Sequence, residues 1–520
     1  MGDNKQPIAT DWQQWASLPA SLYSAEQLRA LDRRAIAAGT PALQLMQRAA
    51  RAALAVLQRH WPQAQRLSIY CGGGSNGGDG YLLAKLACER GLQVTLIEMA
   101  TADRLRNDAA LARAAALSAG IEPCLFSVQT LQAQHERADV VVDALLGTGL
   151  NGVLRADYAA AIAKINCADR PVLALDIPSG LCSDTGRLCG EVAVQATATV
   201  TFVGLKLGLF TAAAVDYIGR LSCHDLALGP ALSDSISPSA TLCQLDELTA
   251  AIPRRHRSGN KNQHGHLLII GGDHGMGGAP LLAAQAALRC GVGLVTVATR
   301  ASQVAAILSR QPEVMALPCE QAEDLTAALA RATAVVVGPG LGKSAWGQQL
   351  LQCLKAQSLP ILLDADALNL SLDPHFLPQH AAVITPHSGE AARLLGSTAE
   401  QIDADRLASA AALHQYSDAV AVLKGAGTVI ASGEGAQLCP YGNAAMATAG
   451  MGDVLSGVIG AYLAQGVCAN RAAALGVSLH AAAADAAVAE SGLYGFASSD
   501  MPAALRRLIN DLLSSTKAGD

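Results

Sequence analysis

The sequence has few aromatic residues and no cluster of positive charge. Only 3% of its 520 residues are Phe, Trp or Tyr, although 51% are hydrophobic. The cores must therefore consist mainly of Ala, Leu, Val and Ile, which suits buried parallel strands flanked by alanine-rich helices. The net charge of -6 is spread along the chain and lacks the basic footprint of a nucleic-acid-binding surface. We expect no nucleic-acid partner.

Disulfide frameworks and membrane segments are also unexpected. The thirteen cysteines contain no CxxC pair and no regular spacing, as expected for reduced thiols. The first twenty residues have no apolar stretch typical of a signal peptide. No uninterrupted apolar run reaches the roughly 18 residues that a membrane span needs. We therefore predict a soluble, cytoplasmic protein without a membrane partner.

The order of the patterns predicts two α/β domains. In the first half, strand-like segments at 66–71, 92–99, 138–147, 170–180 and 196–204 alternate with helical ones. A Ser- and Pro-rich stretch follows, and a second α/β series begins near residue 265. We predict two three-layer α/β/α domains, at residues 1–230 and 245–520, joined by a linker at 231–244. The first is predicted to be a Rossmann-like doubly wound sheet.

A glycine-rich segment, "GGGSNGGDG" at residues 72–80, lies between a predicted strand and a predicted helix. Because glycine loses much freedom on folding, such a cluster indicates close backbone approach or positive φ. Doubly wound sheets bind ligands at this junction, and the helix N-terminus there favours phosphate. Successive N–H groups of such a loop can also form an anion-binding nest. A tight turn below a crowded helix is the alternative.

Other polar residues follow neighbouring predicted strands. Asp143 precedes a second glycine turn, Asp176 and Ser179 follow the next strand, and Lys206 follows another. Because parallel strands place their carboxyl ends on one edge, these residues can converge on a single site. Each acid alone is explained as well by a helix cap or a turn.

Together these segments resemble the NAD(P)H-hydrate epimerase domain over about residues 20–230. The resemblance implies that Asp176 handles the proton of epimerisation, that Lys206 stabilises negative charge, and that Asn76, Asp143 and Ser179 hold K⁺. It also implies that the hydrated dinucleotide contacts two segments, which comprise Ser75, Asn76, Gly77, Gly78 and Asp79, and Gly147, Thr148, Gly149, Leu150, Asn151, Gly152 and Val153. The family usually has Gly-Pro-Gly-Asn-Asn where this chain has residues 72–76, and Met-Glu-Asn-Ala where it has residues 46–49.

The second half contains a sharper motif, "AGMGD" at residues 449–453, directly before a helical pattern. A Gly-x-Gly-Asp turn at a helix N-terminus supplies N–H donors and a positive dipole for a transferring phosphoryl group. Asp453 can accept the proton of an attacking hydroxyl. The alternative is an ordinary N-cap role for Asp453. Other strand ends carry Asp364, which could simply form a turn, and His387, which could simply cap a helix.

With "VGPGLG", "LLDADALN", "TPHSGE" and "KGAGT" in order, this half resembles the ADP/ATP-dependent NAD(P)H-hydrate dehydratases over about residues 245–515. That resemblance implies a ribokinase-like fold, Mg²⁺, and ADP or ATP as cofactor, with ADP favoured. The implied hydrate contacts are Ala279, Gly340, His387 and Asp453. The implied nucleotide contacts are Lys424, Gly425, Ala426, Gly427, Thr428 and Gly452. The family's "GGTGD" and "TPHPGE" are "AGMGD" and "TPHSGE" here. The change to Met451 removes a hydroxyl next to the phosphoryl path, but the backbone donors survive it, so we expect activity to be retained.

The two resemblances predict a bifunctional repair enzyme, an isomerase and a lyase, for NADH hydrate and NADPH hydrate. One domain would interconvert the R and S epimers. The other would phosphorylate the S epimer with ADP and eliminate phosphate, releasing AMP and restoring NAD(P)H. We also expect a homo-oligomer. Two alternatives stay open: a ribokinase-class kinase that phosphorylates a vitamin-precursor alcohol, and a nucleotide-binding sensor or scaffold.

Overall fold

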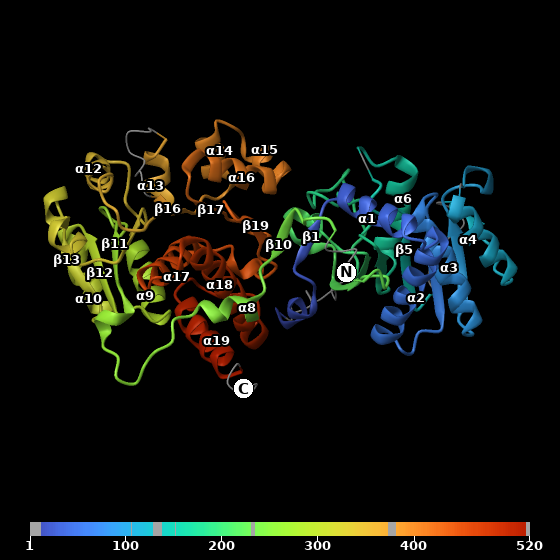
Figure 1. The fold of residues 1–520 in the computed structure, drawn as a ribbon, viewed down its shortest axis with the longest axis horizontal. Helices are drawn as coiled ribbons and strands as arrows, with labels where there is room; N and C mark the ends of the chain where they lie inside the picture. Colours follow the sequence, from blue (N-terminus) through green and yellow to red (C-terminus); the bar gives the residue numbers. More distant parts are fainter. Residues whose placement is uncertain are drawn as a thin grey trace. The chain divides into compact units, whose positions relative to one another are not determined.

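The computed structural model describes residues 12–105, 107–127, 138–150, 152–229, 235–372 and 381–515. It divides into two compact units (Figure 1). One unit is Leu18–Thr241. The other is Leu242–Asp520 together with Met1–Ser17.

These bounds differ from the predicted domains at two places. The short 3₁₀ helix η1 (Trp12–Ser17) belongs to the second unit and contacts its long helix α18 (Ala469–Ser491), although we expected residues 1–230 to form one domain. In addition, the predicted linker at 231–244 contains a strand, β10 (Ala240–Leu242). Residues 231–234 of that linker lie outside the described residues.

The sheet of the first unit is parallel throughout, as predicted for a doubly wound fold. Its strand order is β4-β3-β2-β5-β6-β7-β9. The strands are β2 (Arg66–Cys71), β3 (Gln93–Glu98), β4 (Cys124–Leu125), β5 (Val140–Ala144), β6 (Val172–Leu175), β7 (Ala198–Phe202) and β9 (Arg220–His224). Neither β4 nor β9 was predicted from the sequence.

Helices cover both faces of this sheet. Buried side chains of α2 (Ala42–His60), α3 (Ser75–Glu89) and α4 (Asn107–Ser118) share one core with one face. Those of α6 (Ala156–Cys167) share another core with the opposite face. The first unit is therefore a three-layer α/β/α structure.

Short strands outside the seven-stranded sheet join the two ends of this unit. Strand β1 (Ser21–Tyr23) pairs in parallel with β8 (Leu205–Lys206) and antiparallel with β10. Helix α1 (Ala25–Ala37) follows β1 and begins with the predicted capping box, in which Ser24 and Gln27 bond each other's N–H groups.

The second unit also contains a largely parallel sheet, in the order β13-β12-β11-β14-β15-β16-β17-β18-β19. Among the described strands of this series, only β18 is reversed, and it pairs antiparallel with β17 and with β19. The strands are β11 (His266–Ile270), β12 (Leu294–Thr299), β13 (Met315–Pro318), β14 (Ala334–Val337), β15 (Ile361–Leu363), β16 (Ala381–Ile384), β17 (Val420–Leu423), β18 (Val429–Ser432) and β19 (Gly435–Leu438).

Two groups of helices cover this sheet (Figure 1). One group is α9 (Gly278–Arg289), α10 (Ala301–Arg310), α17 (Met451–Ala464), α18 and α19 (Met501–Ser515). The other includes α12 (Ala345–Cys353), α13 (Ala365–Leu370), α14 (Ser388–Leu395), α15 (Ala399–Ala404) and α16 (Arg406–Ser417). The short helices α8 (Leu245–Leu248) and α11 (Thr326–Leu329) complete the unit.

Among the described helices, only α18 is long and apolar enough to cross a membrane, judged by length and composition. However, 83% of its most apolar window is buried inside the protein. Core helices of globular domains have the same character, so α18 is weak evidence for a membrane span.

The glycine-rich segment at 72–80 differs from the loop that we predicted. Helix α3 already begins at Ser75, so residues 75–80 form its first turns. Only Gly72, Gly73 and Gly74 precede the helix, and none of the glycines at 72–80 has a positive φ. Close approach, rather than left-handed backbone, therefore accounts for this cluster.

The glycines of this segment lie close to other residues of the chain. A Cβ on Gly77 would collide with the carbonyl oxygen of Gly72, and one on Gly80 would lie 2.6 Å from the Cβ of Ala144. A Cβ on Gly78 would lie 2.5 Å from the sulfur of Met46 on α2. These glycines let α3 lie directly against β5 and α2, so its first turn is held at the sheet edge.

We predict that Gly77→Ala lowers the free energy of unfolding by about 1–3 kcal/mol or more, because the added methyl meets rigid main chain. Gly74→Ala is the matched control, since nothing lies within 4 Å of its Cβ direction. Urea unfolding followed by circular dichroism measures both. Equal stability of the two variants would contradict the packing explanation.

Candidate active sites

In the first unit, an ion pair forms at the carboxyl edge of the sheet. Asp176 follows β6 and has a φ of 68°, a conformation that non-glycine residues rarely adopt. The Nζ of Lys206 lies 2.6 Å from Oδ1 of Asp176 and also donates to Oγ1 of Thr201 at 2.6 Å. The Lys206 side chain is only 1% exposed, whereas that of Asp176 is 15% exposed. The pair is therefore largely shielded from water, with the carboxylate on its accessible side.

The second glycine turn lies against this carboxylate. The N–H of Thr148 donates to Oδ2 of Asp176 at 3.3 Å. A Cβ on Gly147 would lie 3.0 Å from the same oxygen and 3.3 Å from the Cβ of Asn76. The structure thus brings the two predicted substrate segments and Asp176 together. Of the other predicted turn residues, Gly149, Leu150, Gly152 and Val153 continue the turn, and Asn151 lies outside the described residues.

The three residues expected to hold K⁺ provide oxygen atoms with restricted exposure. The buried Asp143 accepts from Oγ of Ser179 at 2.7 Å and from its N–H at 2.8 Å. Burial raises the pKa of Asp143 to about 6, although the bonds from Ser179 oppose this. Both polar atoms of the Asn76 side chain are buried without a hydrogen-bond partner among the described residues. Buried amides normally have partners, so Asn76 suits a ligand that is not part of the chain.

Two further carboxylates interact with Asp176. Burial, then Asp176 and Asp32, raise the pKa of Asp79 well above its usual value. Burial, then Asp176, raise the pKa of Asp32 to about 6. Asp79 was predicted as a substrate contact, but Asp32 was missed. In the sequence, Asp32 could have been found from its position four residues after Leu28, which places it on the buried face of α1.

In the second unit, the predicted phosphoryl site is the first turn of α17. Gly450, with a φ of 88°, is the N-cap, and Asp453 is the third residue of the helix. The alternative that Asp453 is the N-cap is therefore wrong. Burial and then Asp364 raise the pKa of Asp453 to about 7, while Lys424 lowers it. An acid that titrates near neutrality is suited to proton transfer.

Lys424 lies beside this turn and pairs with acids. Its Nζ is 2.8 Å from Oδ1 of Asp364 and 3.8 Å from Oε2 of Glu390. Oγ of Ser456, three residues after Asp453 on α17, donates to the other oxygen of Asp364 at 2.7 Å. A Cβ on Gly452 would lie 3.4 Å from Nζ of Lys424. This lysine, predicted as a nucleotide contact, therefore directs its charge toward the first turn of α17.

The rest of the predicted nucleotide loop follows β17. Gly425 and Ala426 are exposed, and Gly425 and Gly427 have φ values of 145° and 65°. Oγ1 of Thr428 closes the loop by donating to the carbonyl of Gly425 at 3.0 Å. The buried Arg406 lies beneath this loop, and we missed it because nothing in the sequence separates it from a surface arginine.

Two predicted hydrate contacts lie together at the start of α9. A Cβ on Gly340, which has a φ of 58°, would lie 3.3 Å from the Cβ of Ala279. Gly342 follows shortly and donates its N–H to Asp366 at 3.0 Å. Asp366 in turn raises the pKa of Asp453, after burial and Asp364, so this turn adjoins the same site.

His387, a further predicted hydrate contact, is the N-cap of α14. Its Nδ1 accepts from the N–H groups of Gly389 at 3.0 Å and Glu390 at 3.4 Å. The Glu390 carboxylate accepts from the N–H of His387 at 2.9 Å, which completes a capping box. The side chain is 55% exposed. The structural role that we considered for His387 is thus present, and its exposed edge stays open to a ligand.

Known proteins match both halves of the chain. A family profile described as NAD(P)H-hydrate dehydratase matches residues 267–507, and one described as YjeF-related protein N-terminus matches residues 42–208. A protein of Coxiella burnetii, named bifunctional NAD(P)H-hydrate repair enzyme, is 42% identical over 94% of this chain and 99% of its own length. The chain belongs to the bifunctional NAD(P)H-hydrate repair enzymes.

Other members of this repair family match similarly. The Escherichia coli K12 protein of the same name is 42% identical over 95% of both chains. Among solved structures, an ADP/ATP-dependent NAD(P)H-hydrate dehydratase from Bacillus subtilis, co-crystallised with ATP/Mg²⁺, is 26% identical. It covers 52% of this chain and 98% of its own, with a TM-score of 0.47.

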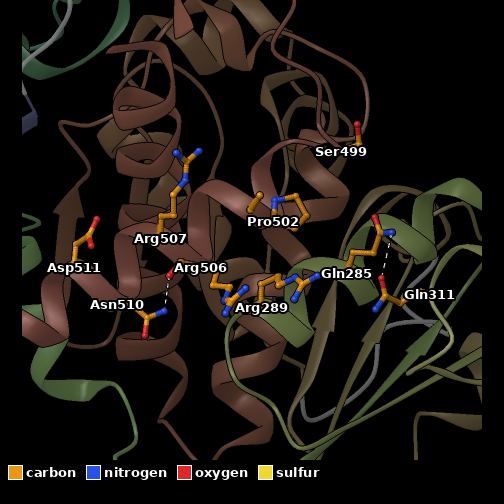
Figure 2. A pocket seen from close by; sticks show the side chains of 10 residues that line it. Gln285, Arg289, Gln311, Ser499, Pro502, Arg506, Arg507, Asn510 and Asp511 are labelled. Carbon is orange, nitrogen blue, oxygen red and sulfur yellow. Dashed lines mark hydrogen bonds between the residues drawn. The ribbon is translucent and has the colours of Figure 1, made fainter. Parts of the chain in front are cut away.

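A separate hollow of about 610 Å³ lies on the second unit, between α9 and α19 (Figure 2). Its lining contains none of the predicted site residues. The lining residues are Gln285, Arg289, Gln311, Ser499, Pro502, Ala503, Arg506, Arg507, Asn510 and Asp511. The active-site features described above therefore lie outside this hollow.

We predict that His387→Ala lowers stability by about 1 kcal/mol through loss of the cap, whereas His387→Asn retains it because Asn is a good N-cap. Thermal unfolding of the two variants measures the difference. If His387 also contacts the hydrate, both variants lose dehydratase activity, and only His387→Ala loses stability. Full activity in His387→Asn would leave the cap as the only role of this residue.

Proposed function

We propose that the first unit interconverts the R and S epimers of NADH hydrate and NADPH hydrate, and that the second dehydrates the S epimer with ADP or ATP. The observation that carries this proposal is the pairing of a lysine with a carboxylate in each unit, beside an N-terminal helix turn. The first unit pairs Lys206 with Asp176, and the second pairs Lys424 with Asp364 next to Asp453. Membership of the repair family supports it.

In the proposed epimerase, Asp176 moves the proton at the hydrated nicotinamide. Lys206 holds one carboxylate oxygen, which leaves Oδ2 toward the glycine turn. The same ammonium, buried at low dielectric, would stabilise negative charge that develops on the ring. The first N–H groups of α3, from Ser75 to Gly77, have no intrahelical acceptor and would bind the substrate phosphates.

A K⁺ ion fits beside this site. Asn76 offers an unpartnered buried amide oxygen, and Asp143 and Ser179 offer a carboxylate and a hydroxyl. Oxygen donors of this kind suit a hard cation. When bound, the ion would supply positive charge next to the substrate-binding turns.

In the proposed dehydratase, Asp453 accepts the proton of the hydrate hydroxyl. The hydroxyl oxygen then bonds to the terminal phosphoryl group of the nucleotide, and AMP leaves when that nucleotide is ADP. N–H groups at the start of α17 would stabilise the transferring group. Loss of phosphate and a ring proton restores NAD(P)H. Phosphorylation is needed because hydroxide is a poor leaving group.

Mg²⁺ is proposed to arrive with the nucleotide. No cluster of three His, Cys, Asp or Glu side chains among the described residues is arranged to hold a metal. Magnesium usually keeps several waters and binds through substrate phosphates with one or two carboxylates, and carboxylates of this kind line the site. Its charge would support phosphoryl transfer.

We also place the enzyme in the cytoplasm. No disulfide joins any of its thirteen cysteines, all of which lie within the described residues. This agrees with a reducing compartment. The homo-oligomer stays a prediction.

We predict that Asp176→Asn stops epimerisation and leaves dehydration intact. Wild-type enzyme with ADP and Mg²⁺ should restore the full 340 nm absorbance from a mixture of both hydrate epimers. The variant should stop near the S fraction in the same time. Mixing Asp176→Asn protein with Asp453→Asn protein should restore full recovery, since each supplies what the other lacks. If the wild type restores no absorbance at 340 nm with either ADP or ATP, the dehydratase proposal is wrong. Accumulation of a stable phosphorylated alcohol would favour a kinase.

We predict that dehydration of the S epimer speeds up as pH rises through about 7. Below that pH Asp453 is protonated, because burial and Asp364 raise its pKa, and it cannot accept the hydroxyl proton. The measurement is kcat/KM for the hydrate between pH 5.5 and pH 8.5. ADP binding over the same range is the control, because it separates titration of the nucleotide from titration of Asp453. A flat profile would remove the base role of Asp453.

A further inference from the structure

Arg406, the first residue of α16, lies buried below the predicted nucleotide loop. It is 5% exposed, and its Nη2 donates to the carbonyl oxygens of Leu423 and Lys424, both at 3.0 Å. These carbonyls belong to the last residue of β17 and the first of the loop. A single guanidinium therefore fixes the peptide units through which the loop leaves the sheet.

The other end of this guanidinium holds the start of α14. Nη1 donates to Oδ1 of Asp403 at 2.8 Å and to Oγ of Ser388 at 3.3 Å. Oγ of Ser388 donates to the same Asp403 oxygen at 2.6 Å. Ser388 is adjacent to His387, so Arg406 connects the hydrate-side turn to the nucleotide-side loop. Ser388 is also the position at which this chain departs from the "TPHPGE" pattern.

The loop also packs against the guanidinium. A Cβ on Gly425 would lie 2.8 Å from Nη2 and 3.1 Å from both Cζ and Nη1 of Arg406. Glycine is therefore required for two reasons, its φ of 145° and this contact. The conformation of the loop depends directly on the position of Arg406.

We propose that Arg406 is a positioning residue that sets the nucleotide-binding loop at residues 424–428, and that Ser388 completes its support in this chain. The inference rests on the proposed function, because it assumes that this loop receives ADP or ATP. A guanidinium behind the loop also contributes positive charge where the nucleotide phosphates would lie, and its burial increases the effect of that charge.

A purely structural role makes a different prediction. If Arg406 only joined α14, α16 and β17, its replacement would lower stability. It would then impair kcat/KM for the nucleotide and for the hydrate to the same extent. A positioning role instead raises the KM and Kd for the nucleotide more than the KM for the hydrate, and it leaves the epimerisation rate close to wild type.

The test compares Arg406→Lys and Arg406→Met with Arg331→Met in the full-length chain. Arg331 is an exposed arginine that also bonds a main-chain carbonyl, at 3.1 Å from Ala327, but lies away from the loop. Lysine keeps the charge and loses the forked donor geometry. We expect at least a tenfold rise in ADP Kd and KM for Arg406→Lys, a larger rise for Arg406→Met, and no change for Arg331→Met.

Ser388→Pro and Gly425→Ala keep the test decisive if Arg406→Met fails to fold. Proline fits the first position of a helix, so Ser388→Pro should fold and raise ADP KM only a few-fold, because Asp403 still holds Arg406. Gly425→Ala and Arg406→Lys should be non-additive, as expected for residues in contact. Wild-type ADP affinity in Arg406→Lys, or additive effects, would overturn the inference. ADP binding without any NADH recovery by the wild type would sink only the proposed function.

Discussion

Both candidate sites depend on one constraint, the alignment of the carboxyl ends of parallel strands. Because all described strands of the first sheet, and β11 to β17 of the second, run in one direction, polar residues that follow different strands meet at one edge. Each unit then places a lysine among carboxylates at that edge, Lys206 with Asp176 and Lys424 with Asp364. Burying such a charge is costly unless it is paired, so these pairs restrict the geometry of everything around them.

The glycines have a different role from the one that their abundance indicated. Gly77 and Gly80 let α3 approach the sheet, and on α17 Gly457 faces the main chain of α9 in the same way. Direct helix contact brings the free N–H groups of a helix terminus to the edge where the acids lie. The positive φ of Gly450 serves the same end, because it turns the chain so that Asp453 enters the first turn of α17.

Buried polar groups link the predicted motifs to each other. Ser456 donates to Asp364, which in turn pairs with Lys424, while Arg406 holds the loop that begins with Lys424. In the first unit, Asp32 adds a third carboxylate to the environment of Asp176. Such networks raise or lower pKa values through partners that are distant in the sequence. Burial first, and then Asp364, bring the pKa of Asp453 near neutrality.

Much of the fold and of the two candidate sites could be predicted from the sequence, because the periodicity of hydrophobic residues and the residues at strand ends can be recognised within short segments. Strand β2, the capping box of Ser24, the alternating order of strands and helices, and the segments that carry Asp143, Asp176 and Asp453 all follow from patterns a few residues long. Tertiary structure alone decided that α3 begins at Ser75, that Trp12–Ser17 joins the second unit, and that Arg406 is buried. Those features depend on contacts between residues far apart in the chain, and a charged residue on an amphipathic helix looks the same in sequence whether solvent or another helix covers it.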